Sequence, residues 1–275
     1  MDAEKVTAPG LARRKAQGEL VAERIVLVTA YDATFAALAD EAGVDVILVG
    51  DSLGMVVQGV ANTLPVTLDE AVYHTRLAAR GASRALVVGD LPFGSYQVTP
   101  QQGVESSIRL IKEGGAAAVK LEGGVPMADT IEAITAVDIP VMAHIGLTPQ
   151  SFHRMGGHRV QGRTSGSQAG GRDRLVADAK AVEAAGAFSV VLEGMPRSLA
   201  AEITANLSIP TIGIGAGPEC DGQVLVLHDV LGLTPSLYKF AKAYADLRSE
   251  VIVALGAYAQ DVRDGTFPDD AHSFH

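Results

Sequence analysis

Acidic side chains stand at the ends of four apolar runs that are rich in β-branched residues. The acids, each with the run that it follows, are Asp51 after 44–49, Asp90 after 85–88, Glu122 after 118–121 and Glu193 after 188–192. Such runs predict strands that are buried on both faces of a parallel sheet. Carboxylates gathered at one end of a sheet repel one another, so stability alone gives no reason for the pattern. A divalent cation and a proton-transfer site would explain it.

Three of these acids could bind a metal ion. Asp51 and Asp90 end neighbouring strands, where like charges either share a proton or bind a cation, and Glu122 adds a third oxygen donor. A set of carboxylates without cysteine suits a hard ion, which means Mg²⁺, or Mn²⁺ in its place. The alternative is that each acid caps the helix or turn that follows it.

Lys120 precedes Glu122 by two residues, so the period of a strand puts both side chains on the same side, which we expect to be the inner one. Beside three acids the ammonium group should be charged, and it would neutralise a bound anion or a developing oxyanion. A Schiff-base role would need a lowered pKa, which neighbouring carboxylates oppose. A simple ion pair with Glu122 is the structural alternative.

Three further residues are candidates for substrate chemistry. Glu193 could act as a general base, and the alternative is a surface acid in a loop. His144 ends another strand-like run and could hydrogen-bond a hydroxyl group of a product, although a structural histidine fits nearly as well. Ser52 offers a hydroxyl group beside Asp51, but a serine at such a position commonly does no more than cap a turn.

Eight strand-like runs, separated by helical stretches, position these side chains. The expected strands are 25–30, 44–49, 85–90, 117–122, 139–144, 188–193, 210–215 and 224–229. Right-handed crossovers between them leave either an open doubly wound sheet or a closed barrel. We predict a (β/α)8 barrel, because its active site lies at the C-terminal ends of the strands, where every candidate residue falls. The length of 275 residues fits a single domain over 1–275.

Three segments lie outside the regular repeat. Residues 6–18 could form a short N-terminal helix, and residues 237–262 a helical C-terminal region. The longest irregular stretch, 146–172, follows the fifth strand. A connection of that length in a compact domain predicts a lid or a binding loop.

The composition narrows the class of protein. The net charge of −10 argues against a nucleic-acid surface, which needs a basic face. A single cysteine, Cys220, excludes an intrachain disulfide framework and fits a reducing compartment. No apolar run approaches the ~18 residues of a membrane span. We therefore expect a cytoplasmic protein that acts on small molecules and has neither a nucleic-acid nor a membrane partner.

Seven segments of the sequence, taken together, resemble the ketopantoate hydroxymethyltransferase family (3-methyl-2-oxobutanoate hydroxymethyltransferase). They are 29–32 (TAYD), 49–55 (VGDSLGM), 90–93 (DLPF), 119–124 (VKLEGG), 144–150 (HIGLTPQ), 160–163 (VQGR) and 213–217 (GIGAG). The resemblance implies a (β/α)8 barrel of the phosphoenolpyruvate/pyruvate type, Mg²⁺, 5,10-methylenetetrahydrofolate as one-carbon donor, and a homo-oligomer, which is a decamer in much of the family.

The resemblance also implies roles for individual residues. Asp51, Asp90 and Glu122 fall on the metal positions, and Glu193 falls on the base. The 2-oxo acid positions fall on Asp51, Ser52, Asp90 and Lys120, with His144 near the new hydroxymethyl group. The implied reaction passes a hydroxymethyl group to 3-methyl-2-oxobutanoate through a Mg-stabilised enolate and gives 2-dehydropantoate, a step of pantothenate biosynthesis.

The sequence departs from the family pattern at a few positions. Departures at His153, Arg154 and His158 concern the folate side and lid closure, and Gly194 follows the base where another residue is usual. Two other functions stay open at this point. One is a folate-independent, metal-dependent 2-oxo acid lyase or mutase on the same barrel, and the other is a barrel that binds a metabolite without catalysis.

Overall fold

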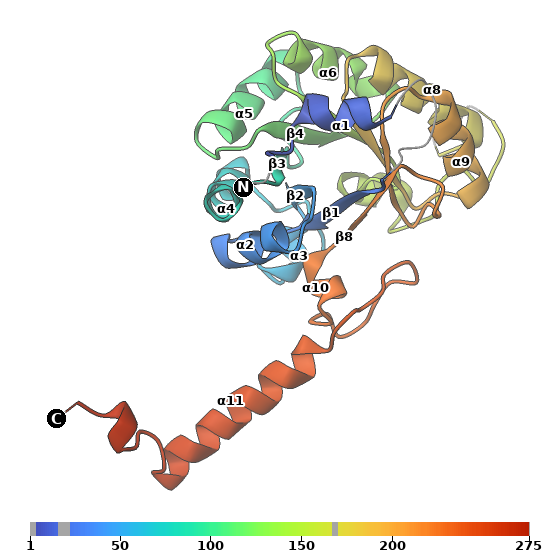
Figure 1. The fold of residues 1–275 in the computed structure, drawn as a ribbon. Coiled ribbons are helices and arrows are strands. Elements are labelled where there is room, and N and C mark those ends of the chain that lie inside the picture. The colour runs from blue at the N-terminus through green and yellow to red at the C-terminus, as the bar shows by residue number, and fades with distance from the viewer. Residues whose placement is uncertain (1–3, 16–22, 167–169, 275) are drawn as a thin grey trace. The chain divides into compact units, whose positions relative to one another are not determined.

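A closed ring of eight parallel strands forms the centre of the computed structural model, which describes residues 4–15, 23–166 and 170–274 (Figure 1). The strands pair in chain order. They are β1 (Ile25–Thr29), β2 (Val46–Val49), β3 (Leu86–Asp90), β4 (Ala118–Glu122), β5 (Val141–Gly146), β6 (Ser189–Glu193), β7 (Thr211–Ile214) and β8 (Gly222–Leu225). β8 returns to pair with β1, which confirms the predicted (β/α)8 barrel.

Helices connect the consecutive strands from β1 to β7 and surround the barrel, whereas β7 and β8 are joined by a short irregular connection (Figure 1). They are α2 (Ala33–Glu41), α3 (Leu53–Val56), α4 (Leu68–Gly81), α5 (Pro100–Lys112), α6 (Ala128–Thr135), α7 (Phe152–Met155), α8 (Arg172–Ala184) and α9 (Arg197–Asn206), with short 3-10 turns at η1 (Val125–Met127) and η2 (Pro149–Ser151). Local chemistry fixes where several begin. Thr67 and Glu70 form a capping box at α4, and Thr99 caps α5, which opens on Pro100.

Side chains alternate between two apolar layers, as the period of a strand requires. One layer fills the space between the strands and the outer helices and includes Val119, Leu121 and Ile145. The other fills the lower part of the lumen and includes Val88, Ala118, Met142 and Val191. The next inward-facing position on each of these strands is polar, and it lies at the C-terminal end of the barrel.

The N-terminal helix α1 (Ala8–Arg14) closes the opposite end of the lumen. Thr7 caps it through Gly10, and Leu11 joins the lumen layer. Beyond the helix, the Lys15 side chain is fully buried, and its Nζ lies 2.8 Å from Asp221 Oδ2 and 2.7 Å from the carbonyl oxygen of Thr204. The helix is shorter than the predicted 6–18, of which residues 16–18 lie outside the described part of the chain.

Several element boundaries differ from the sequence-based expectations. β8 ends at Leu225 instead of residue 229, because Leu227–Val230 forms the short helix α10, so Asp229 does not end a strand. The helix α6 was not predicted. Its residues lie between the Gly-Gly-Val-Pro turn and β5, and only Thr130, Ile131 and Ile134 of the helix are buried, which gives a short and weak periodic pattern.

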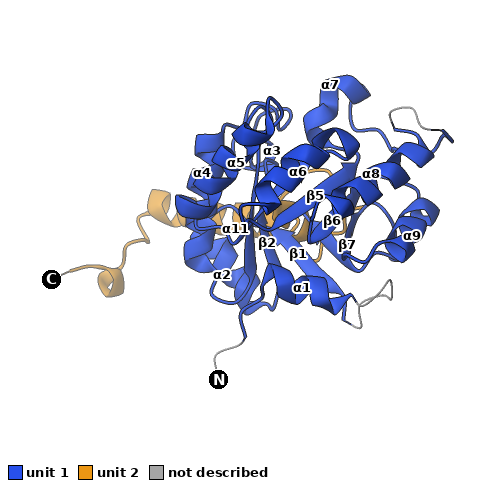
Figure 2. Ribbon diagram, turned by 90° about the horizontal axis from the view of Figure 1, so that it is seen from above, with its two compact units in different colours: residues 1–226 blue, residues 227–275 orange. Residues whose placement is uncertain are grey.

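The chain divides into two compact units, residues 1–226 and residues 227–275 (Figure 2). The first contains the barrel. The second contains α10, α11 (Leu247–Asp264) and the 3-10 turn η3 (Asp270–His272), so its main helix begins ten residues later than the predicted region 237–262. The expectation of a single domain stays a prediction. No helix in the described ranges is long and apolar enough to cross a membrane.

Candidate active site

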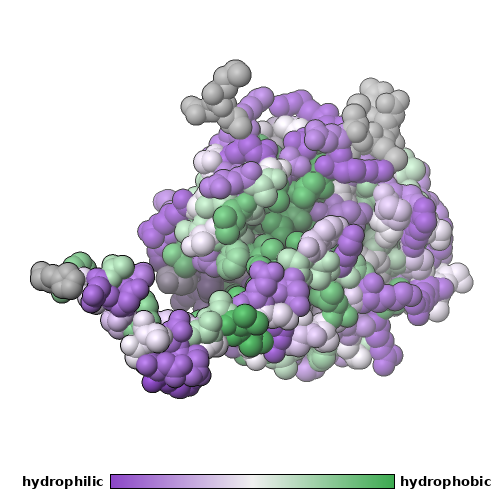
Figure 3. All heavy atoms as spheres, turned by 60° about the horizontal axis from the view of Figure 1, so that its bottom comes forward, coloured by the Kyte–Doolittle hydropathy of each residue, from purple (hydrophilic) through white to green (hydrophobic). Residues whose placement is uncertain are grey.

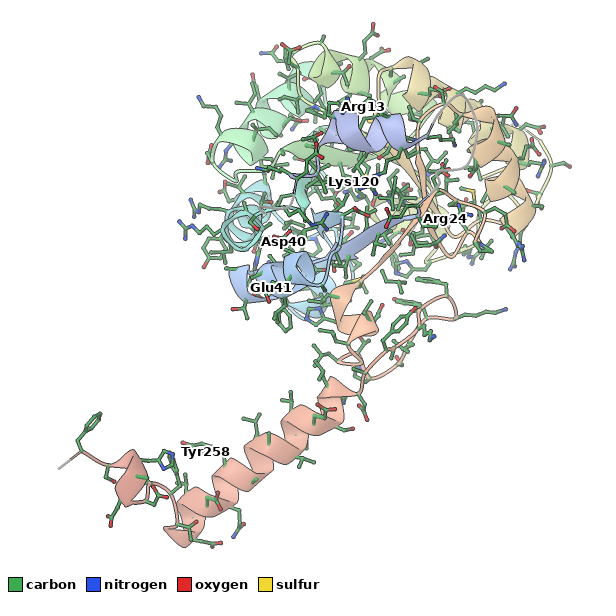
Figure 4. All side chains as sticks on the ribbon, viewed as in Figure 1. Arg13, Arg24, Asp40, Glu41, Lys120 and Tyr258 are labelled. Atoms are coloured by element: carbon green, nitrogen blue, oxygen red, sulfur yellow. The ribbon has the colours of Figure 1, made fainter. Side chains whose placement is uncertain are left out.

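The register of the barrel brings the predicted polar side chains into one place. Asp90 on β3 pairs with Lys120 on β4, and Glu122 on β4 pairs with His144 on β5. Each lies two or four residues beyond an apolar lumen residue of its own strand, so all four face inward. Together with Asp51 they are at most 5% exposed. Lys120 lies within the ring of strands, away from the outer surface (Figure 4).

The first part of the site is a buried cluster of two aspartates and one lysine. Lys120 Nζ donates to both carboxylate oxygens of Asp90 at 2.8 Å, and the backbone N–H of Asp51 donates to Asp90 Oδ2 at 3.3 Å. Burial raises the pKa of Asp51 well above its ordinary value, and the charges of Asp90 and Glu122 raise it further. Burial also raises the pKa of Asp90, against the opposing effect of Lys120.

Lys120 keeps its positive charge in this surrounding. Burial lowers its pKa, but the three neighbouring carboxylates outweigh burial and raise the pKa above the ordinary value. Its Nζ is 4.0 Å from Glu122 Oε1, against 2.8 Å from Asp90, so Asp90 is the main partner. A charged ammonium group does not form a Schiff base, and the residue suits the neutralisation of an anion.

The second part of the site places His144 between two glutamates. His144 Nδ1 is 3.4 Å from Glu122 Oε1, and Nε2 is 3.1 Å from Glu193 Oε2. Burial disfavours the imidazolium ion, yet the contacts with Glu122 and Glu193 raise the pKa of His144 to about 9. The pKa of Glu122 is lowered, because contacts with His144 and Lys120 outweigh the effect of burial. The Glu193 side chain is only 14% exposed and faces the network, so it is not a surface acid.

Gln150 and Tyr96 join the two parts, and the sequence reasoning missed both as site residues. Gln150 Nε2 donates to Asp51 Oδ2 at 3.0 Å, and its backbone N–H donates to Glu122 Oε2 at 2.9 Å. Tyr96 donates from its hydroxyl group to Gln150 Oε1 at 2.7 Å. Their one sequence signal was that Gln150 ends the segment HIGLTPQ, which was noted only for the resemblance. Neither side chain has a charge or a metal-ligand spacing that would single it out.

Ser52 lies beside the cluster but does not cap the helix that follows it. The Oγ of Ser52 is 2.8 Å from the hydroxyl oxygen of Tyr31, and α3 has no side-chain cap. A Cβ atom built on Gly50 would lie 3.0 Å from Ser52 Oγ and 3.8 Å from Asp90 Oδ2. A glycine at position 50 therefore leaves room between the hydroxyl group and the carboxylate.

Close backbone contact holds the ends of β5 and β6 together. Gly146 has a φ of 98°, and a Cβ atom there would lie 2.2 Å from the carbonyl oxygen of Glu193, so a side chain is excluded. Gly194 has a φ of 55°, which explains why glycine suits the position after Glu193. The backbone that carries His144 and Glu193 is thus fixed on both strands.

The other positions that differ from the pattern of the resembled family, His153, Arg154 and His158, lie on or beside the short helix α7. The Phe152 ring makes edge contacts with the rings of His153 and His158, at centroid distances of 5.6 and 5.3 Å. Arg154 is exposed, and its Nη2 donates to Ser151 Oγ at 3.3 Å. Whether the stretch 146–172 acts as a lid stays a prediction, and its residues 167–169 lie outside the described ranges.

The donor set can be tested against a hard cation. Asp51, Asp90 and Glu122 supply only oxygen atoms, and Glu122 Oε1 is buried without a hydrogen-bond partner in the described structure. As the side chains stand, no three His, Cys, Asp or Glu residues among those described are placed to hold one ion together. Mg²⁺ is commonly held by one or two carboxylates, with water and substrate completing its shell, so the set fits it. The assignment of all three acids as ligands stays a prediction.

Comparisons with known proteins place the whole chain in a family. The model of a family described as ketopantoate hydroxymethyltransferase matches residues 5–270. A relative from Pelobacter propionicus, named 3-methyl-2-oxobutanoate hydroxymethyltransferase, is 56% identical over 98% of this chain and 98% of its own length.

Solved structures of lower identity show the same fold. A 2,3-dimethylmalate lyase, described as a member of the PEP mutase/isocitrate lyase superfamily, matches with a TM-score of 0.61 at 19% identity, over 98% of this chain and 89% of that one. A phosphonopyruvate hydrolase in complex with oxalate and Mg²⁺ matches with a TM-score of 0.61 at 16% identity, over 98% and 92%. The family match covers nearly the whole chain, and from it we conclude that the chain belongs to the ketopantoate hydroxymethyltransferase family.

Proposed function

We propose that this protein transfers a hydroxymethyl group from 5,10-methylenetetrahydrofolate to 3-methyl-2-oxobutanoate and so forms 2-dehydropantoate in pantothenate biosynthesis. The observation that carries the proposal is the buried network that joins Asp51, Asp90, Lys120, Glu122, His144 and Glu193. It occurs in a chain that is 56% identical, over nearly its whole length, to a protein named for this reaction.

Asp51, Asp90 and Glu122 are the residues that would hold Mg²⁺. When bound, the ion would polarise the keto group of the 2-oxo acid and so acidify the neighbouring C–H bond. Support comes from the all-oxygen donor set and from Glu122 Oε1, which is buried among charged groups but makes no hydrogen bond in the described structure. It also comes from the raised pKa of Asp51, which reflects burial beside two like charges that a cation would offset.

The chain's own residues divide the remaining work. Lys120, charged and buried, would neutralise the negative charge of the 2-oxo acid and of the oxygen on which charge develops, and the Ser52 hydroxyl group would bind the same anion. Glu193 would take the proton from C3, since it is the most exposed acid of the network and lies across the barrel from Asp51. His144, which contacts Glu193, would hydrogen-bond the new hydroxymethyl oxygen.

A product assay with and without methylenetetrahydrofolate tests the proposal against its alternative. The protein should convert 3-methyl-2-oxobutanoate to 2-dehydropantoate only when the folate and Mg²⁺ are both present. A folate-independent lyase or mutase would instead consume a 2-oxo acid without the folate. Failure to bind Mg²⁺ or any 2-oxo acid in calorimetry would favour a barrel without catalysis and would overturn the proposal.

We further propose a homo-oligomer, which the resemblance suggests is a decamer, in the cytoplasm. Support comes from α11, on which Val251, Leu255, Tyr258 and Val262 recur with helical spacing and are 46–62% exposed. Figure 3 shows apolar residues, in green, on the face of the molecule that is turned toward the viewer. An apolar stripe of this length on a helix predicts an interface with another subunit.

A further inference from the structure

Tyr31 follows the end of β1 and contacts a residue of the site, but the roles proposed above do not use it. Ile25 and Leu27 of this strand face the lumen, and the same spacing of two residues continues to Tyr31, just beyond the strand. The register that pairs Thr29 with Leu48 brings it beside the residues that follow β2. Tyr31 is only 3% exposed, and a buried phenol group normally keeps a hydrogen-bond partner.

Contacts with three other elements fix the backbone that carries this tyrosine. The carbonyl oxygen of Tyr31 accepts a hydrogen bond from His74 Nδ1 of α4 at 2.8 Å. The backbone N–H of Ala30 donates to the carbonyl oxygen of Leu48 on β2 at 3.2 Å, and the side chain of Asp32 caps α2. The ring of Tyr31 therefore extends from a backbone that is held on both sides.

The hydroxyl group of the tyrosine meets the serine that we assign to the 2-oxo acid. The hydroxyl oxygen of Tyr31 is 2.8 Å from Ser52 Oγ, and the serine side chain makes no cap hydrogen bond to α3. The missing side chain of Gly50 leaves a space that is bordered by Ser52 Oγ and by Asp90 Oδ2. Ser52 Oγ thus contacts the tyrosine and also borders the space beside a proposed metal ligand.

The direction of this hydrogen bond decides what the serine can do. A hydroxyl group has one proton to donate and two lone pairs that accept. If Ser52 donates to Tyr31, its proton is no longer available to a bound carboxylate. If Tyr31 donates, the serine proton is free for the carboxylate, and the phenol is the more acidic of the two groups. A chain of donors from Tyr31 through Ser52 to an anion also strengthens each hydrogen bond in it.

We propose that Tyr31 is a positioning residue for the 2-oxo acid, whose hydroxyl group donates to Ser52 Oγ and so directs the serine O–H toward the substrate carboxylate. The inference rests on the proposed function, because it concerns how the first substrate is held. The structural alternative is that Tyr31 only fills space at the end of β1, where its hydroxyl group uses the nearest oxygen atom.

A double-mutant cycle with Tyr31→Phe and Ser52→Ala tests the assignment, because each variant loses one hydroxyl group and little volume. Calorimetry with saturating Mg²⁺ and no folate measures the dissociation constant of 3-methyl-2-oxobutanoate. It should rise about five- to tenfold in either single variant, the size expected for one lost hydrogen bond. Tyr31→Phe should add no further loss where Ser52 is already alanine, since the tyrosine then has no hydroxyl group to direct. Tyr73→Phe, which removes the hydroxyl group of an exposed tyrosine on α4, should match the wild type.

Steady-state kinetics provide a second measurement. The loss in Tyr31→Phe should fall on KM for the 2-oxo acid and much less on kcat, since the carboxylate is bound alike in the ground state and the transition state. Penalties that multiply in the double variant, or an unchanged dissociation constant in Tyr31→Phe, would overturn the inference. If the wild type binds no 2-oxo acid in the presence of Mg²⁺, the proposed function fails instead, so the two failures are distinguishable.

Discussion

Replacement of Lys120 by methionine should destabilise the barrel more than any other single loss of charge in the site. The ammonium group is 2.8 Å from both oxygens of Asp90 and 4.0 Å from Glu122, and all three side chains are at most 5% exposed. Its removal leaves Asp51, Asp90 and Glu122 together without their nearest cation. Loss of one partner of a buried ion pair typically costs about 3–5 kcal/mol in the free energy of unfolding.

The loss of unfolding free energy in Lys120→Met should depend on pH, and the pKa of Asp90 sets its direction. Burial already raises the pKa of Asp90, and Lys120 opposes that rise, so the variant should raise it further. The folded variant then binds a proton more tightly than the unfolded chain, whose aspartates have a pKa of about 3.9. Its stability is therefore fullest below that value and falls as pH rises through the raised pKa of the folded state. The free energy of unfolding of Lys120→Met should therefore fall further below that of the wild type at pH 8 than at pH 5.5.

Urea unfolding, followed by circular dichroism in EDTA at both pH values, measures the effect. Lys120→Arg, which keeps the charge, should lose less, and the exposed Lys180→Met should stay within about 0.5 kcal/mol of the wild type. Excess Mg²⁺ should stabilise Lys120→Met more than the wild type, because a cation at the aspartates restores the missing charge. An unchanged urea midpoint in EDTA at both pH values would refute this reasoning.

Three further predictions concern other parts of the chain. Gln150→Leu removes the donor to Asp51 Oδ2 and should weaken Mg²⁺ binding about 10–100-fold in calorimetry, with an unchanged circular dichroism spectrum. Asp40→Asn should cost about 1–2 kcal/mol at pH 7 in urea unfolding. The hydrogen bonds from Ser83, Arg84 and Ala85 outweigh burial and lower the pKa of Asp40 to about 2, so this stability is present above about pH 4 and lost as pH falls through 2. On α11, Leu255→Asp should reduce the mass found by sedimentation, and the exposed Gln260→Glu should leave it unchanged.

The barrel could be predicted from the sequence because each of its strands is a short, strongly apolar run. The side chains of such a run alternate between the lumen and the layer under the outer helices. That pattern located all eight strands and put Lys120 and Glu122 on the same side. It was a poor guide to short helices. The helix α6 buries few residues, so its periodic pattern is weak. The helix α10 begins two residues after the end of β8, and the apolar residues of both elements form one continuous run in the sequence, which predicted a single longer strand.

The candidate site divides in the same way. Charged residues at strand ends were predictable, because a carboxylate or an ammonium group inside an apolar pattern is conspicuous. Gln150 and Tyr96 were not, since their role depends on contacts made across 54 residues of sequence by uncharged groups. The pairing of Lys120 with Asp90 in place of Glu122 also needed the register between β3 and β4, which composition does not contain.

Exchange of the C3 hydrogen of 3-methyl-2-oxobutanoate in deuterated water tests the central claim most directly, with Mg²⁺ present and folate absent. The wild type should exchange this hydrogen, and Glu193→Gln should abolish the exchange while it still binds the 2-oxo acid in calorimetry. Exchange by Glu193→Gln at the wild-type rate would contradict the assignment of Glu193 as the base that faces the buried network.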